Sequence, residues 1–325
     1  MILGVGSAGH HHGEILQGAT RCEGEVVPCL ITMPVGGVGS RVRYVEVGPD
    51  GPVVPVEARG PVATQALAAE RTRSTVPGQS VDVIPALKTK AGRAASLALA
   101  FVGAPAFGRL EIECSVPTGV GLGSSTCDVV AAIRAVCDAY GVQLDAAQVA
   151  RLAIEAEGAA DPIMFDGEMV LFAQRQGRVL ESFGSWMPRY AVLSIDTDPG
   201  GPGVDTLSLP MPRYTDAELV AFESMIGKVR QAFAHRDPVT LAAVATESAT
   251  LNQRFVPLRK FQEIRDLATE YRALGVQISH SGTVAGILFD SRAAQLSDAL
   301  AHEVTERVRS MGVRPRGLLT TGADH

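Results

Sequence analysis

One stretch constrains the fold more than any other: the ten residues PTGVGLGSST, from Pro117 to Thr126. A polar/apolar alternation over residues 109–116 predicts a strand that runs into it, and apolar residues at helical offsets from Val129 to Tyr140 predict a helix that runs out of it. Glycines at alternate positions let the backbone approach a ligand closely and adopt positive φ. Because the N–H groups and the positive dipole end of the helix point back at the loop, this stretch predicts an anion site.

The hydroxyl residues at the start of that helix allow three roles. They can cap the helix, bond a phosphate oxygen or ligate Mg²⁺. The loop has no lysine, so it does not fit the G-x-x-x-x-G-K-[ST] pattern of a Walker A sequence. A capped helix after a tight turn, without any ligand, is the alternative that the loop alone leaves open.

Patterns elsewhere predict a chain of mixed helices and strands. The first 60 residues indicate short β-rich segments, and alanine-rich stretches predict helices over 64–70 and 88–101. Asp145 with Gln148, and Thr215 with Glu218, have the spacing of helix N-caps. Further strands are expected over 169–173, 190–195, 276–279 and 284–290, and further helices after Asp237-Pro238, over 261–274 and up to about residue 311. The composition changes near residue 186, which is where we expect a domain boundary.

Composition narrows the class of protein. The chain has 325 residues and a net charge of −6 without a basic block, which argues against a nucleic-acid partner or an anionic membrane surface. Its five cysteines form no C-x-x-C, so reduced thiols in a cytoplasmic protein are expected. The N-terminus lacks the pattern of a signal peptide, and the longest apolar run, 94–107, is too short to cross a bilayer.

The loop and three other stretches resemble one family. Pro117, Gly121, Leu122, Gly123, Ser124, Ser125 and Thr126 fill the motif P-x-x-x-G-L-G-S-S-[AT] of the GHMP superfamily of small-molecule kinases. GHHHGEILQG (residues 9–18) and SHSGTVAG (279–286) are similar to the N- and C-terminal motifs of its L-threonine kinase branch, which serves cobamide biosynthesis. STCD (125–128) and ADPIMF (160–165) resemble two further segments of that branch.

The resemblance implies a fold and an activity. It implies the two-domain α+β GHMP kinase fold, with an N-terminal domain similar to domain 2 of ribosomal protein S5 over 1–185 and a ferredoxin-like C-terminal domain over 186–325. It implies transfer of phosphate from ATP, with Mg²⁺, to the hydroxyl of a small-molecule acceptor, first of all L-threonine, giving O-phospho-L-threonine for cobalamin synthesis in the cytoplasm. A homodimer is compatible with this assignment.

Site residues follow from the same resemblance. Gly119, Gly121, Gly123, Ser124 and Ser125 would hold the ATP phosphates, flanked by Pro117, Leu122 and Thr126. Ser125 would lie near Mg²⁺, with Glu157 favoured over Glu155 as the carboxylate that completes the metal site. Asp161 would take the proton of the acceptor hydroxyl. His11, His12, Glu14, Gln17, Ser281 and Gly282 would line the acceptor site.

The three histidines at 10–12 leave the acceptor open. The three histidines are not interpreted as a purification tag, because the GEILQG segment of the motif follows them directly. Consecutive residues of an extended segment point to alternating sides, so the three side chains are poorly placed to chelate one ion. The histidines depart from the threonine kinase pattern and favour, as a rival, a kinase of the same fold acting on another hydroxylated metabolite. A ligand-binding regulator that has lost catalysis is the rival from another class.

Overall fold

The computed structural model describes residues 2–47, 72–76, 79–105, 107–116, 121–201, 208–280, 283–291 and 298–322. The chain forms two compact units that interleave along the sequence. Unit 1 comprises Met1–Ala8, Val38–Ser115 and Ser125–Ala160, and unit 2 comprises Gly9–Gly37, Val116–Ser124 and Asp161–His325. The domain boundary expected from composition near residue 186 stays a prediction. The two units are defined by contacts and interleave along the sequence, so they do not test a single boundary.

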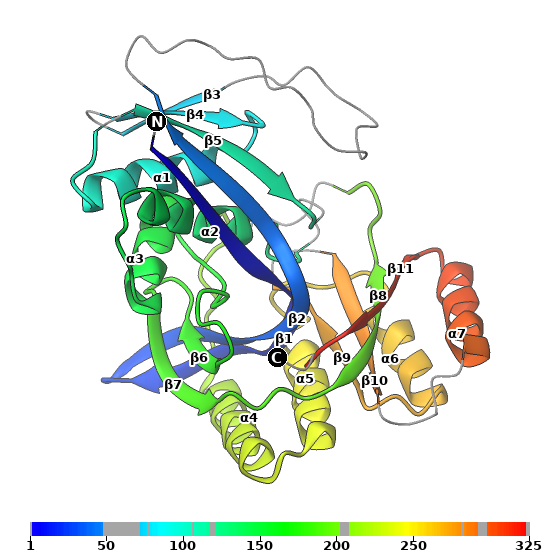
Figure 1. Cartoon of the computed structure of the whole chain (residues 1–325). Coiled ribbons are helices and arrows are strands. Elements are labelled where there is room, and N and C mark those ends of the chain that lie inside the picture. Colours follow the sequence, from blue (N-terminus) through cyan, green and yellow to red (C-terminus); the bar gives the residue numbers. More distant parts are fainter. Residues whose placement is uncertain are drawn as a thin grey trace. The chain divides into compact units, whose positions relative to one another are not determined.

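Two long strands, β1 (Leu3–Cys22) and β2 (Glu25–Glu46), contribute to both units. The other elements of unit 1 are β3 (Thr72–Val76), β4 (Gln79–Ile84), α1 (Thr89–Phe101), β5 (Phe107–Cys114), α2 (Ser124–Ala139) and α3 (Ala146–Glu157). Within this unit, β5 pairs antiparallel with the end of β2 and parallel with β4, and β4 pairs antiparallel with β3. The three helices lie together beside these strands (Figure 1).

Helix α2 packs directly on the beginning of β1. A Cβ atom at Gly4 would lie 2.1 Å from the backbone oxygen of Ala135, and one at Gly6 would lie 2.1 Å from that of Ala131. Only glycine therefore permits this approach of strand to helix. The contact fixes the helix whose N-terminus receives the glycine-serine loop.

The cap of α3 forms as the sequence predicts. The Asp145 side chain accepts a hydrogen bond from the backbone N–H of Gln148, and the Gln148 side chain accepts one from the N–H of Asp145. Gly158 ends the helix in the left-handed conformation. These two ends place Glu157 in the last turn of α3.

Unit 2 continues with strands and helices from residue 169 onward. They are β6 (Met169–Ala173), β7 (Arg178–Gly184), β8 (Tyr190–Asp196), α4 (Asp216–His235), α5 (Pro238–Asn252), α6 (Phe261–Glu270), β9 (Gly275–Ile278), β10 (Val284–Asp290), α7 (Asp298–Ser310) and β11 (Arg314–Thr320). Within this unit the strands run in the order β11-β8-β10-β9-β1, all antiparallel, while β6 pairs with β2 and β7.

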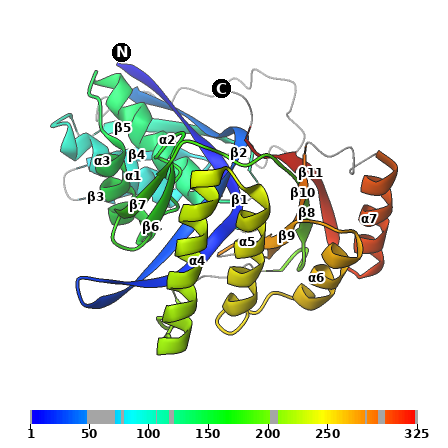
Figure 2. The ribbon, with the colours of Figure 1, turned by 90° about the horizontal axis from the view of Figure 1, so that it is seen from below.

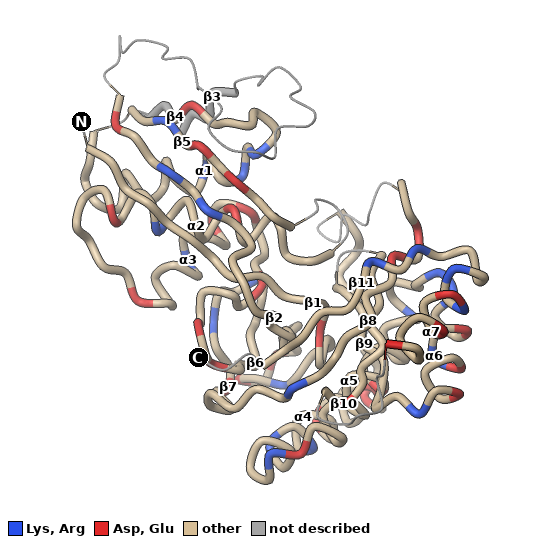
Figure 3. The backbone as a smooth tube through the Cα atoms, turned by 45° about the vertical axis from the view of Figure 1, so that its right-hand side comes forward, with Lys and Arg blue, Asp and Glu red and all other residues tan. Residues whose placement is uncertain are grey.

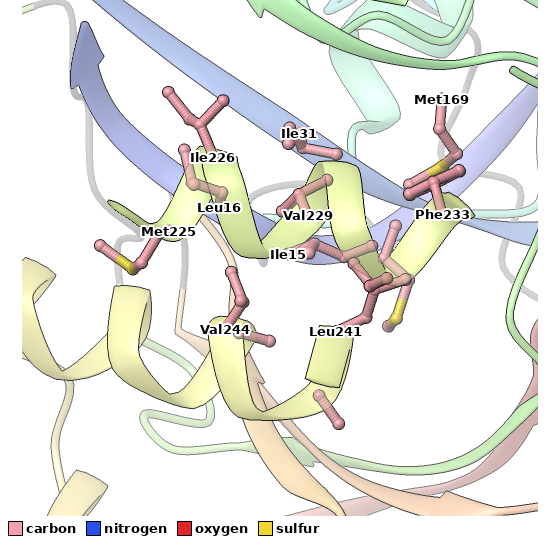
Figure 4. Close-up of a cluster of buried hydrophobic side chains, with 14 of the residues drawn as sticks. Ile15, Leu16, Ile31, Met169, Met225, Ile226, Val229, Phe233, Leu241 and Val244 are labelled. Atoms are coloured by element: carbon pink, nitrogen blue, oxygen red, sulfur yellow. The ribbon is translucent and has the colours of Figure 1, made fainter. Parts of the chain in front are cut away.

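Two apolar clusters hold unit 2 together. One packs α4 and α5 against β1 and β2, with Ile15, Leu16 and Ile31 facing Met225, Val229 and Leu241 (Figure 4). The other packs α6 and α7 against β8, β9 and β10. Neighbouring residues of β8 enter different clusters, Val192 the first and Leu193 the second, as successive side chains of a strand do. Figure 2 shows α4 and α5 side by side next to β1.

Charged side chains of unit 2 are mixed in sign along its outer helices. Figure 3 shows acidic and basic positions interspersed over α6 and α7. Arg307 of α7 pairs with Glu270 of α6 at 3.0 Å, with both side chains about half exposed. Among the described residues, no helix combines the length and the apolar character that crossing a membrane requires.

The structure differs from the sequence prediction mainly in its strands. The short β-segments expected in the first 60 residues are two strands of 20 and 22 residues over the described part of that region. Strand β11 carries Pro315 and Gly317 and has a register shift between them, so it lacks a clear alternation. The helix expected over 64–70 lies outside the described residues, whereas the helix expected over 88–101 is α1.

Candidate active site

The glycine-serine loop has the conformation that its glycines predict. Gly121 and Gly123 have φ values of +81° and +73°, and α2 begins at Ser124. A Cβ atom at Gly123 would lie 2.3 Å from the ring of His11 and 3.5 Å from a carboxylate oxygen of Asp161. Gly123 is thus required twice, for its φ and for its contact with the His11 ring. The predicted loop residues Pro117 and Gly119 lie outside the described residues.

A hydroxyl-carboxylate cluster forms in unit 1 where α2 begins. Ser125 Oγ donates to one carboxylate oxygen of Glu157 at 2.7 Å, and Thr126 Oγ1 donates to the other at 2.8 Å. Glu157 is 6% exposed, whereas Glu155 is exposed, so of the two candidates only Glu157 meets Ser125. A serine hydroxyl beside a carboxylate offers the hard oxygen donors that Mg²⁺ prefers, and the cluster fits the predicted metal site.

Asp128, the aspartate of the STCD segment, connects the start of α2 to two neighbouring elements. Asp128 is buried, accepts a hydrogen bond from Ser40 Oγ at 2.7 Å and pairs with Lys88 Nζ at 2.5 Å. Ser40 lies on β2, and Lys88 is the N-cap residue of α1. Asp128 therefore ties β2 and α1 to the first turns of α2. Sequence reasoning did not find Lys88, because nothing local links it to a residue 40 positions away.

A second cluster forms in unit 2 around His11. His11 Nε2 lies 2.9 Å from Asp161 Oδ2, and His11 Nδ1 lies 3.9 Å from Glu14 Oε1. His11 and Glu14 are each 2% exposed, and the Asp161 side chain is 21% exposed. Asp161 follows the glycine that ends α3, so the turn after that helix delivers the carboxylate to β1. Three residues predicted for the acceptor side thus converge.

The electrostatics of this cluster follow from burial and charge. Burial alone would lower the pKa of His11, but the charge and hydrogen bond of Asp161 and the charge of Glu14 outweigh it and raise that pKa to about 9. Burial raises the pKa of Glu14, and the charge of His11 opposes the rise. His11 is therefore an imidazolium at neutral pH.

His12 has a different environment. It is fully buried, its Nε2 lies 2.7 Å from Ser194 Oγ, and its Nδ1 contacts the Gln277 side-chain amide. Burial, followed by the charge of His11, lowers the pKa of His12 to about 3, so the ring is neutral. Both ring nitrogens have partners on β8 and β9, which argues against the acceptor-binding role expected for His12 and favours a role in joining β1 to its sheet.

Gln17 and the turn after β9 also come together. His280 Nδ1 lies 3.0 Å from Gln17 Oε1, and the backbone N–H of Gln17 donates to Ser248 Oγ at 2.8 Å. The N- and C-terminal motifs that resemble the threonine kinases are therefore in direct contact. Ser281 and Gly282, the predicted acceptor residues of that turn, lie outside the described residues.

His11, Glu14 and Asp161 are the type of side chains that bind metal ions, and one ligand atom of each lies within 4.8 Å of the others. Their arrangement favours ion pairing instead. The two carboxylates face opposite nitrogens of one imidazole, so an ion held by either nitrogen would displace the carboxylate already there. We interpret this cluster as one imidazolium with a carboxyl group at each ring nitrogen.

Solved structures of other proteins share the fold of this chain. The fold resembles that of a homoserine kinase of Cytophaga hutchinsonii with a TM-score of 0.66 and 15% identity, over 99% of this chain and 95% of that one. It resembles that of a mevalonate kinase of Methanococcus jannaschii with a TM-score of 0.55 and 13% identity, over 98% of each chain. At these identities the likeness concerns the fold alone.

Two curated relatives match in sequence. An L-threonine kinase of Citrobacter freundii is 26% identical over 182 residues, which cover 56% of this chain and 62% of that protein. An L-threonine kinase of Salmonella typhimurium is 25% identical over 202 residues, which cover 61% of this chain and 66% of that protein. The chain therefore spans just under two thirds of the length of these relatives.

Family models match both halves of the chain. The model of the GHMP kinases N terminal domain matches residues 83–166, which include the glycine-serine loop, Glu157 and Asp161. The model of the GHMP kinases C terminal domain matches residues 229–306. The two models follow one another in that order, and the chain belongs to the GHMP kinases.

Proposed function

We propose that this protein transfers the γ-phosphoryl group of ATP to the hydroxyl of a hydroxy amino acid, and that L-threonine is the preferred acceptor. One observation carries the proposal: the Asp161 carboxylate is held by a buried histidine directly against Gly123 of the phosphate loop. The residue that would act as base for the acceptor hydroxyl therefore packs next to the loop that would bind the phosphates.

Phosphoryl transfer requires positioning and charge compensation more than covalent chemistry. The N–H groups at the start of α2 and the hydroxyls of Ser124 and Ser125 would hold the phosphates. Ser125 and Glu157 would hold Mg²⁺, which supplies neutralisation of phosphate charge when it is bound. Asp161 would accept the proton of the acceptor hydroxyl as the bond to phosphorus forms.

The acceptor class follows from Glu14. Within the described part of the chain, neither carboxylate oxygen of Glu14 has a hydrogen-bond partner, and the nearby Thr32 hydroxyl falls short of hydrogen-bond geometry. A buried carboxyl group whose oxygens accept no hydrogen bond costs free energy, and the 3.9 Å ion pair with His11 is longer than a hydrogen bond. An N–H donor of the acceptor would recover that free energy, and the α-ammonium group of an amino acid is such a donor. The sequence relatives named L-threonine kinase make threonine the first candidate.

Two other readings are weaker. A hydroxylated metabolite without an amino group would offer the Glu14 oxygens, which have no hydrogen-bond partner in the described part of the chain, no ammonium donor. A regulator without catalysis would not need Asp161 and Glu157 placed as they are. A role of the product in cobamide synthesis, a cytoplasmic location and a homodimer belong to the same proposal, and their support is the resemblance to the threonine kinase branch.

The test is an acceptor panel. ADP release with Mg-ATP is measured for L-threonine, L-serine, L-homoserine and 3-hydroxybutyrate, the last of which resembles threonine without the ammonium group. We expect the highest kcat/KM for L-threonine and a loss of at least tenfold for 3-hydroxybutyrate. Equal or better use of 3-hydroxybutyrate would contradict the amino acid assignment.

A further inference from the structure

His11 stands between two carboxylates, one at each ring nitrogen. Asp161 lies 2.9 Å from Nε2, and Glu14 lies 3.9 Å from Nδ1. His11 and Glu14 belong to the same strand and are three positions apart, whereas Asp161 comes from the turn after α3. The imidazole of His11 therefore connects Glu14 of its own strand to Asp161, which is 150 positions from His11 in the sequence.

Burial strengthens the electrostatic interactions within this cluster. His11 and Glu14 are almost entirely removed from solvent. Two carboxyl groups at this separation repel each other in a low-dielectric interior when both are charged. Burial raises the pKa of Glu14 to about 8 even beside His11, so Glu14 is the group that takes up a proton, and the charge of the His11 imidazolium acts on Asp161 at 2.9 Å. The His11 ring is also packed against Gly123, so it has little freedom to move away.

We propose that His11 is a positioning residue that keeps Asp161 ionised and aligned, and that Glu14 anchors the other side of the His11 ring. This inference rests on the proposed function, since it concerns the readiness of Asp161 to accept the acceptor proton. It assigns His11 to the base and not to direct contact with the acceptor. It also gives a role to one of the three histidines by which this chain departs from the threonine kinase pattern.

Three further histidines and one arginine lie close enough to act on the charges of this cluster. From β1, His10 and His12 have pKa values lowered by burial, so both are neutral. From the turn after β9, burial lowers the pKa of His280, an effect that Asp161 opposes and that Arg175 and His11 reinforce. Arg175, which follows β6, is the arginine of this set. The contacts that join Glu14 and Asp161 through one side chain are those of His11.

The pH dependence of kcat separates this role from a purely structural one. In His11→Gln the ring charge is lost while a polar side chain remains, and Glu14 still lies near Asp161. An opposite charge at this distance lowers a carboxyl pKa by about one to three units. We therefore expect the acid limb of the kcat profile to move up by about one to three pH units, with much of kcat recovered at alkaline pH. A structural defect would lower kcat equally at every pH.

Controls and an independent readout complete the test. His302→Gln, an exposed position on α7, should leave the profile unchanged. The titration of His11 itself is followed by NMR of the histidine side chains in the wild-type protein, which does not depend on the folding of the variant. We expect His11 to titrate well above the ordinary value of 6.5. We also expect its pKa to fall in Glu14→Gln and to fall further in Asp161→Asn.

Two results would overturn the inference: an acid limb in His11→Gln that coincides with the wild-type limb, or a His11 resonance that titrates at or below 6.5. Failure of the proposed function has a different signature. If no hydroxyl acceptor is phosphorylated, or if Asp161→Asn retains its kcat, the kinase proposal or the base role fails. The NMR titration still tests the pairing of His11 with both carboxylates in either case.

Discussion

Substitution of Gly123 by alanine tests the contact between the phosphate loop and His11. Two costs add at this position. An L-residue in the left-handed region loses about 1–2 kcal/mol, and Gly123 has φ +73°. The new Cβ atom would also lie 2.3 Å from the His11 ring, which must move and give up its 2.9 Å contact with Asp161.

The second cost is the larger one. Removing one partner of a buried charge pair costs about 3–5 kcal/mol, and partial exposure of Asp161 argues for the lower end. We expect a total of about 4 kcal/mol for Gly123→Ala. At about 2 °C per kcal/mol for a chain of this size, the melting temperature should fall by about 8 °C.

Gly141 provides the matched control. It has φ +64°, close to that of Gly123, but nothing lies within 4 Å of the position of its Cβ atom. Gly141→Ala should therefore show the backbone cost alone, about 1–2 kcal/mol, with unchanged kinetics. Melting temperatures with and without Mg-ATP give stability and nucleotide binding together, since a bound ligand stabilises by RT ln(1 + [L]/Kd). Equal stability and equal activity of the two variants would refute the contact.

Three further predictions concern the carboxylates and the buried histidine. Asp161→Asn should lower kcat by about 10²–10⁴-fold with little change in the KM for ATP, as seen in steady-state kinetics, and a variant with most of its kcat would show that positioning suffices without a base. Glu157→Gln should raise the Mg²⁺ concentration needed for half-maximal rate, because a ligand loses its charge, and an unchanged Mg²⁺ dependence would exclude Glu157 from the metal site. The raised pKa of His11 stabilises the fold fully below pH 6.5, and this contribution is lost as the pH rises towards 9. The free energy of unfolding measured in urea should therefore fall by about 3 kcal/mol from pH 6 to 9. The raised pKa of Glu14 acts in the same direction, and His11→Gln should make the fall smaller.

Local features of the sequence predicted the local parts of the site. The loop glycines, the caps of α3 and α4 and the hydroxyl residues at the start of α2 depend on neighbours within a few positions. The structure confirms these conformations. The roles assigned to Ser125 and Glu157 stay predictions, although their 2.7 Å hydrogen bond is consistent with them.

The other contacts of the site could not be predicted from the sequence, because they join residues that are far apart in it. Neither the contact of His11 with Asp161 nor that of His12 with Ser194 can be predicted from nearby residues, since the partners are 150 and 182 positions apart. Alternation along β1 separates His11 from His12, but it does not say which ring meets a carboxylate. The length of β1 and β2 was missed because both strands contain several glycines, which weaken a strand pattern.

Direct phosphoryl transfer from ATP to an acceptor hydroxyl is tested by mass spectrometry of the products formed from Mg-ATP and L-threonine in ¹⁸O-labelled water. We expect O-phospho-L-threonine that contains no ¹⁸O, because the bridging oxygen comes from threonine and the others from ATP. Labelled inorganic phosphate as the only phosphorylated product besides ADP would show that water is the acceptor, and it would rule out the proposed transfer to a hydroxyl.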